Sequence, residues 1–224
     1  MDDGSHSPEI SAKMLDAETQ QGVASVVLTP HFYALKESPD DFLKRREIAI
    51  NRLRQVYLPG YHPVLYAGAE VAYYRGISKS EAIEKLMIRG TRTILIEMPF
   101  TDWAEPVINE IYELRDNRGM IPVIAHYERY PQSRKTAEGL LARGIIFQTN
   151  AEYVLEKRGG RKALKYIDKG IFSLLGSDSH NLSDRAVNMR AGMKKIEAAL
   201  GPDALYNLEA NAELLLSKAE PLFP

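Results

Sequence analysis

Six short apolar runs divide this sequence at fairly even intervals, and they constrain its fold more than any other feature. Each contains four to six consecutive apolar residues, which is typical of strands buried on both faces of a parallel sheet. Segments with helical patterns lie between them. The runs cover residues 23–30, 62–70, 92–99, 121–128, 145–150 and 172–180.

The segments between the runs carry signals for the start and end of helices. N-cap residues, in two cases followed by a proline and in one by a capping-box Glu81, predict helix starts at Ser7, Ser38, Ser78, Thr101 and Ser183. Glycines that end helices are expected at Gly22, Gly90, Gly119, Gly144 and Gly170. The last helix should run to about residue 200, and the glycine pair at 159–160 is interpreted as a local turn. Strands alternating with helices predict an α/β fold, either an open doubly wound sheet or a barrel.

Length and composition predict one globular domain that covers residues 1–224. The formal net charge is -1, which does not support a role in binding nucleic acid or a membrane surface. The chain has no cysteine, which excludes disulfides, thiolate metal ligands and a thiolate nucleophile. It shows neither a membrane-spanning apolar run nor a signal peptide at its start. We therefore expect a cytoplasmic protein without membrane insertion.

Polar side chains that can bind metal follow nearly every predicted strand. They are His31, Glu70, Glu97, His126, Asn150, Asp178 and His180. In a parallel barrel all carboxyl ends of the strands lie on one face, so these side chains would meet there. An open sheet would spread them along a line. The pattern therefore favours a barrel, and it explains why the last run ends in an acid and an imidazole two residues apart.

The chemistry of this set points to a metal site. Three histidines, two glutamates and one aspartate are nitrogen and oxygen ligands that suit Mn, Fe or Zn, and more than one ion. Paired ions can hold a phosphoryl group and generate hydroxide near neutral pH. A single histidine or glutamate at a strand end is more often structural, but five of six strands ending this way favours the metal site. His6 and His62 are expected at the surface instead.

Two arginines follow the predicted ligands. Arg129 comes three residues after His126, and Arg185 comes five residues after His180. A guanidinium group binds two phosphate oxygens at once, although either arginine alone could be a plain surface residue. Tyr127 is a candidate for substrate binding at the mouth of the site, with packing as the alternative; the same alternatives apply to Tyr130.

The motifs TPH, GAE, IEMP, IAHYERY and SDSHN, in this order, resemble those of the polymerase-and-histidinol-phosphatase (PHP) superfamily. Within it, the chain is most similar to the manganese-dependent protein-tyrosine phosphatases of bacterial capsule and exopolysaccharide loci. The resemblance implies a distorted (β/α)7 TIM-like barrel, two to three metal ions, often Mn, and hydrolysis of phosphotyrosine on a bacterial tyrosine kinase. It implies metal ligation by His31, Glu70, Glu97, His126, Asp178 and His180, and phosphate binding by Arg129 and Arg185.

The sequence departs from this family at its start. The family's first strand ends in a His-x-His motif shortly before a DDGS segment, whereas here DDGS is residues 2–5, directly after Met1. We therefore expect a barrel without its first strand, with an incomplete metal cluster, reduced stability and weak or no activity. An internal methionine mistaken for the start, or a truncation, would explain this. The coding sequence upstream of Met1 tests the explanation.

The function predicted from these observations is a metal-dependent tyrosine phosphatase that acts on the phosphorylated tail of a bacterial tyrosine kinase. The reaction would be direct attack by metal-bound hydroxide, with Asp178 or a histidine near the cluster assisting proton transfer. One alternative is a PHP phosphatase for a small molecule such as histidinol phosphate. Another is an inactive barrel that serves as a binding module. The charged helix at 39–54 could form a homo-oligomer contact, or a solvated face with an apolar stripe.

Overall fold

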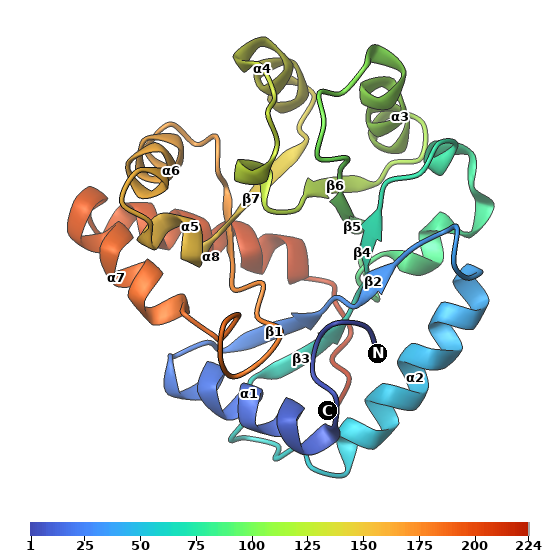
Figure 1. The fold of residues 1–224 in the computed structure, drawn as a ribbon, viewed down its shortest axis with the longest axis vertical. Coiled ribbons are helices and arrows are strands. Elements are labelled where there is room, and N and C mark those ends of the chain that lie inside the picture. The colour runs from blue at the N-terminus through green and yellow to red at the C-terminus, as the bar shows by residue number, and fades with distance from the viewer. Residues whose placement is uncertain (224) are drawn as a thin grey trace.

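The structure, a computed structural model that describes residues 1–223, contains a curled sheet of parallel strands surrounded by helices (Figure 1). The six predicted strand regions are all present, so the α/β barrel-like fold class is confirmed. Two of them are divided into consecutive strands. In chain order the strands are β1 (Ser25–Leu28), β2 (His31–Phe32), β3 (Val64–Ala67), β4 (Glu70–Ala72), β5 (Thr93–Glu97), β6 (Ile121–Ile124), β7 (Ile146–Asn150) and β8 (Leu174–Gly176).

The sheet order places the ends of these strands next to one another. β1 pairs with β3, and β2 continues the sheet in the order β2-β4-β5-β6-β7-β8. The break between β3 and β4 lies at Gly68, where a Cβ atom would be 3.1 Å from Val27 Cγ1, so a side chain here would require the Val27 side chain to shift slightly. Beyond the break His31 is directly opposite Glu70 in the register. The register therefore brings two of the predicted metal ligands next to each other.

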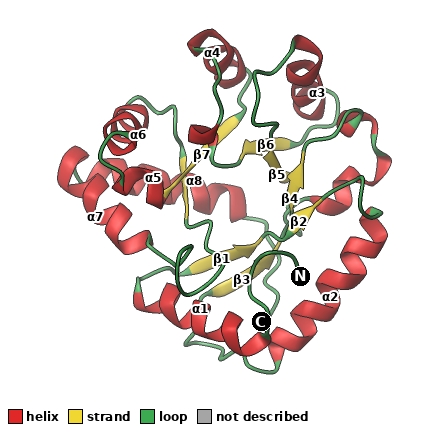
Figure 2. Cartoon of the chain, in the orientation of Figure 1, coloured by secondary structure: helices red, strands yellow, loops and turns green. Residues whose placement is uncertain are grey.

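Residues 1–223 contain eight α-helices and three short 3₁₀ turns, which precede, connect and follow the strands (Figure 2). Ser7 and Ser38 accept backbone N–H groups of the first turn, which confirms both predicted N-caps. The helices are α1 (Pro8–Gln20), α2 (Pro39–Arg54), α3 (Glu105–Asp116), α4 (Arg134–Ala142), α5 (Ala151–Leu155), α6 (Gly159–Asp168), α7 (Met189–Leu200) and α8 (Pro202–Leu216). The turns are η1 (Ile77–Lys79), η2 (Glu81–Leu86) and η3 (Tyr127–Arg129).

The helix predicted from Ser78 is wrong. This segment forms the two 3₁₀ turns η1 and η2, and the Ser78 hydroxyl donates to Glu113 Oε2 at 2.6 Å. Because that hydroxyl bonds to a carboxylate of α3, it does not cap a helix of its own. The prediction of a turn at 159–160 is also wrong, because both glycines open α6 and are buried. A Cβ at Gly160 would lie 2.3 Å from the Val154 carbonyl oxygen, so glycine is needed for close packing.

Two further helix starts differ from the predictions, and one helix was not predicted. α3 begins at Glu105, four residues after Thr101, with a proline in its first turn. α7 begins at Met189, because the Ser183 hydroxyl bonds to Asn181 and Asp184 within a preceding loop. α8 follows α7 directly and was not predicted.

One side of the barrel is open. Among residues 1–223 no β-pairing joins β1 to β8, and a cavity of about 730 Å³ lies there, bordered by both strands and by α1. Helix α1 spans this side instead: Gln21, its C-cap, donates to the Val187 carbonyl at 2.7 Å and accepts from the Arg190 N–H at 3.1 Å. The Ser177 hydroxyl also donates to Glu18 of α1 at 3.2 Å. Within residues 1–223, no helix combines the length and apolarity needed to cross a membrane.

Candidate metal centre

Three predicted ligands come together on one side of the sheet: His31 and Glu70 open β2 and β4, just beyond the carboxyl ends of β1 and β3, and Glu97 ends β5. His31, Glu70 and Glu97 each offer a ligand atom within 4.8 Å of the others. His31 Nδ1 lies 3.8 Å from Glu70 Oε1. The parallel register places these residues at one edge of the sheet, as expected from the positions of the strand ends.

His126 joins this group from the end of β6. Its Nε2 atom lies 3.1 Å from Glu70 Oε1 and 3.6 Å from Glu97 Oε1. The Tyr130 hydroxyl bonds to the other ring nitrogen, Nδ1, at 3.2 Å, and accepts the Met98 N–H at 2.9 Å. Such an outer hydrogen bond orients a histidine that ligates metal. Tyr130 therefore holds the imidazole with Nε2 toward the two carboxylates.

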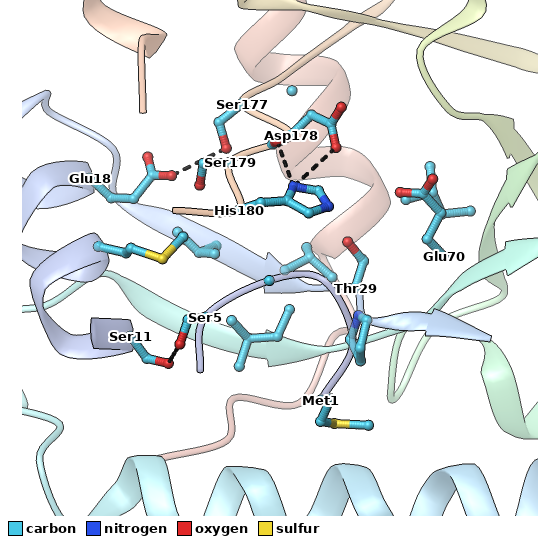
Figure 3. Close-up of a pocket in the computed structure, with 18 of the residues that line it drawn as sticks. Met1, Ser5, Ser11, Glu18, Thr29, Glu70, Ser177, Asp178, Ser179 and His180 are labelled. Carbon is cyan, nitrogen blue, oxygen red and sulfur yellow. Dashed lines mark hydrogen bonds and ion pairs between the residues drawn. The ribbon is translucent and has the colours of Figure 1, made fainter. Parts of the chain in front are cut away.

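Asp178 and His180 reach the site from the loop after β8 (Figure 3). His180 Nδ1 bonds to the Asp178 carbonyl oxygen at 2.9 Å and lies 3.7 Å from its carboxylate. Asn150, at the end of β7, donates to Asp178 Oδ2 at 2.9 Å. All six predicted ligands thus lie in one connected cluster, and Asn150 positions one of them.

Two ligand candidates have an unusual backbone conformation. His126 has φ of 32° and Asp178 has φ of 49°, and within residues 1–223 they are the two non-glycine residues with positive φ. This left-handed region is uncommon for residues with a Cβ, and such residues cluster at functional sites. Both lie where a strand gives way to its loop, so the strained conformation turns each side chain into the cluster.

Arg129 and Arg185 both bind the carboxylate of Asp178. The distances are 2.6 Å from Arg129 Nη2 to Oδ2 and 3.0 Å from Arg185 Nη2 to Oδ1. Burial opposes ionisation of this carboxyl, but the two guanidinium groups outweigh it and hold the pKa of Asp178 below its usual range. The predicted phosphate-binding arginines therefore lie beside the predicted ligands.

Asp3 is a site residue that the sequence reasoning missed. Its Oδ1 atom lies 3.6 Å from His31 Nε2 and 3.5 Å from His180 Nε2, and the three side chains form a second group that could hold a metal ion. Arg185 also contacts Asp3, at 3.3 Å. The signal available in the sequence was the acidic pair at 2–3 directly before the first helix.

The candidate ligand side chains do not satisfy one another, and a bound metal ion would. Burial raises the pKa of Glu97, and the neighbouring Glu70 carboxylate raises it further. His31 Nδ1 is buried without a hydrogen-bond partner among the described residues. Two crowded carboxylates and an unpartnered imidazole nitrogen are satisfied by a bound cation, and nitrogen and oxygen donors suit Mn, Fe or Zn.

Two predictions for individual residues are corrected by burial. Tyr127 is 5% exposed and stacks on Phe147 with ring centroids 3.8 Å apart, so it packs in the core and does not line the mouth. His62 is not a surface residue: it is 6% exposed, with Nε2 3.0 Å from Asp16 and Nδ1 accepting the Leu58 N–H. His6 is exposed, as expected.

Known proteins are similar to this chain in sequence and in fold. The tyrosine-protein phosphatase YwqE of Bacillus subtilis is 27% identical over 225 residues, which cover 96% of this chain and 87% of that protein. The tyrosine-protein phosphatase CpsB of Streptococcus pneumoniae is 28% identical over 211 residues, which cover 85% of this chain and 82% of that protein.

Solved structures agree with these relatives. A structure from a study of YwqE and CpsB, described as metal-dependent tyrosine phosphatases, aligns with a TM-score of 0.81 and 25% identity, over 98% of this chain and 91% of its own. An inactive dihydroorotase-like domain of Chaetomium thermophilum aligns with a TM-score of 0.60 at 8% identity, which shows likeness of fold alone. The family described as "Capsular polysaccharide synthesis, CpsB/CapC" matches residues 1–217. This chain therefore belongs to the CpsB/CapC family of capsular polysaccharide synthesis.

Proposed function

We propose that this chain is a metal-dependent phosphatase that hydrolyses phosphotyrosine in capsular or exopolysaccharide synthesis. One observation carries the proposal: buried and half-buried histidine and carboxylate donors from neighbouring strands and the loops after them converge beside two arginines that share one carboxylate. The names of YwqE and CpsB as tyrosine-protein phosphatases support the substrate class.

Different residues of the site are suited to binding phosphate and to binding metal. Arg129 and Arg185 have N–H groups suited to phosphate oxygens, and both can turn from Asp178 to a bound phosphoryl group. Asp178 then has a carboxylate available for ligation or for holding a proton during the reaction. When bound, metal ions at this cluster would stabilise charge on the phosphoryl oxygens and activate water.

We infer two ligand groups, which is the reason for expecting more than one ion. One consists of His31, Glu70 and Glu97, with His126 adjacent, and the other of Asp3, His31 and His180. Manganese is the proposed ion, with iron and zinc as alternatives of the same ligand preference. The kinase tail as partner, a cytoplasmic location, a single domain and a homo-oligomer stay predictions.

The experiment is release of phosphate from a phosphotyrosine peptide in Mn²⁺, by this chain and by the chain with a family-like first strand restored, each compared with a chelator control. Because this chain is expected to have an incomplete metal cluster, release is expected from the restored version, in which the variants are made. Glu97→Gln should abolish Mn-dependent release, because it removes one charged donor from the cluster. The matched control is Glu209→Gln, which makes the same change at an exposed position of α8. It should leave release unchanged.

Histidinol phosphate is the comparison substrate. Faster release from the phosphotyrosine peptide supports the proposal, whereas selective release from histidinol phosphate would assign the site to a small molecule. Tight binding of the phosphopeptide without release in any metal would instead indicate a binding module.

A further inference from the structure

Three phenyl rings contact the candidate ligands His31 and His126. Tyr130 and Phe100 lie against His126, and Tyr33 lies against His31. Tyr130 is only 5% exposed, and its hydroxyl is bonded to His126. The other two rings lie on loops directly after β2 and β5, so they border the cluster on the side where strands end.

Phe100 is the one exposed ring of the three among residues 1–223. It is 57% exposed, although its plane is within 13° of the His126 ring, with centroids 6.1 Å apart. The Tyr130 ring supports it from a second direction, with centroids 5.5 Å apart. Phe100 is thus held against a candidate ligand while more than half of its surface faces solvent.

Tyr33 is less available as a platform for another ring. It stacks with His31 at 5.6 Å, and Lys36 Nζ lies 4.0 Å from its centroid. The His31 and Lys36 side chains therefore already occupy this ring, whereas Phe100 offers an exposed apolar surface.

Resting on the proposed phosphatase function, we propose that Phe100 is the aryl subsite of this site, on which the ring of a phosphotyrosine side chain stacks. The ester oxygen of an aryl phosphate joins ring and phosphorus directly, so a phosphate held at the cluster brings its ring to the rim of the site. Phe100 lies at that rim, beside His126. An alkyl phosphate has no flat apolar group to fill the same place.

Stacking on Phe100 selects aryl over alkyl phosphates through binding. Offset or edge contacts between aromatic rings contribute enough to change affinity about three- to tenfold beyond burial of area. A leucine at this position would retain apolar area without the aromatic contribution. Phe100 would therefore determine specificity and would not take part in the chemical step.

The test measures binding by calorimetry of phosphonates that cannot be hydrolysed, so it does not depend on turnover. The chain loaded with Mn²⁺ should bind phenylphosphonate about three- to tenfold more tightly than methylphosphonate. Phe100→Ala should remove this ratio while the affinity for methylphosphonate stays unchanged, and Phe100→Tyr should preserve it. Tyr206→Ala, which removes a ring that is 68% exposed on α8, is the control and should also preserve it.

The outcomes separate this inference from the function on which it rests. If methylphosphonate and inorganic phosphate bind but phenylphosphonate has no advantage, the aryl subsite is wrong and a phosphatase site remains. The same holds if Phe100→Ala keeps the ratio. If neither phosphonate nor inorganic phosphate binds to the loaded protein, both the inference and the proposed function fail.

Discussion

At the scale of single residues, Asp178 is the carboxylate on which the polar contacts of the site concentrate. It accepts hydrogen bonds from Arg129, Arg185 and Asn150. A phosphoryl group that enters the site presents similar oxygens to the same donors. The arginines therefore have a partner in the free protein, and we expect them to exchange it for the phosphoryl group when substrate binds.

Replacing one guanidinium fork tests this arrangement. Arg129→Lys keeps the charge but loses the planar pair of donors, so we expect KM for a phosphotyrosine peptide to rise about tenfold with little change in kcat. Steady-state kinetics of the Mn²⁺-loaded chain with a family-like first strand restored measure this. Arg134→Lys, at an exposed ion pair of α4, is the control. An unchanged KM would contradict the role of Arg129 in binding phosphate.

Glu18 predicts a dependence of stability on pH. Burial raises its pKa, although hydrogen bonds from Ser177 and Ser179 partly oppose this. A carboxyl whose pKa is higher in the folded state contributes stability that is complete below the unfolded pKa and is lost as pH rises through the folded pKa. Glu18→Gln removes this loss, so the variant should be more stable than the parent at neutral pH and equally stable below about pH 4.

Urea unfolding at both pH values measures the difference. Glu209→Gln, at an exposed position on α8, should show no such dependence on pH. If Glu18→Gln is less stable than the parent at neutral pH, the ionised carboxylate is the form that the fold favours.

At the scale of elements, local signals predicted the strands and the first two helices, because apolar runs and N-caps depend on neighbouring residues. Serine caps at Ser7 and Ser38 are examples. The predictions failed where a contact with a residue distant in sequence outweighs the local sequence pattern. The Ser78 hydroxyl donates a hydrogen bond to Glu113 of α3, and the glycines at 159–160 allow α6 to pack close to α5.

The approach of α5 and α6 predicts a steric effect at Gly160. In Gly160→Ala the new Cβ would lie 2.3 Å from the Val154 carbonyl oxygen, which is backbone and cannot rotate away. We expect a loss of about 1–3 kcal/mol in the free energy of unfolding. Gly139→Ala, in α4, meets the Tyr112 hydroxyl at 3.2 Å and should cost less, because that side chain can move. Chemical denaturation of both variants measures these free energies of unfolding. Equal losses in the two variants would contradict the packing argument.

At the scale of the whole molecule, the open side between β1 and β8 is the main departure from a closed barrel. The N-terminal segment and α1 cross it through Asp3, Glu18 and Gln21, and the cavity of about 730 Å³ lies behind them. Two free parallel edges and an apolar cavity are features that an added strand would cover.

Addition of a family-like apolar strand ending in His-x-His before Met1 is therefore expected to stabilise the molecule. Pairing with β1 and β8 should raise Tm by about 5 °C, and two further histidines should tighten Mn²⁺ binding. The same addition with both histidines changed to alanine should raise Tm but leave Mn²⁺ affinity as it was. Thermal unfolding and metal titration test this, and no change in either quantity would contradict the expected strand position.

The amino-acid sequence by itself determined the strands, their parallel arrangement and six of the candidate ligands. These follow from apolar periodicity and from the position of polar residues at strand ends, which need no knowledge of distant contacts. Only the tertiary structure decided that Asp3 joins His31 and His180, that Tyr127 packs on Phe147, and that Phe100 lies exposed over His126. The physical reason is that each of these contacts depends on which loops lie next to one another. That is decided by the packing of residues far apart in sequence when the barrel forms.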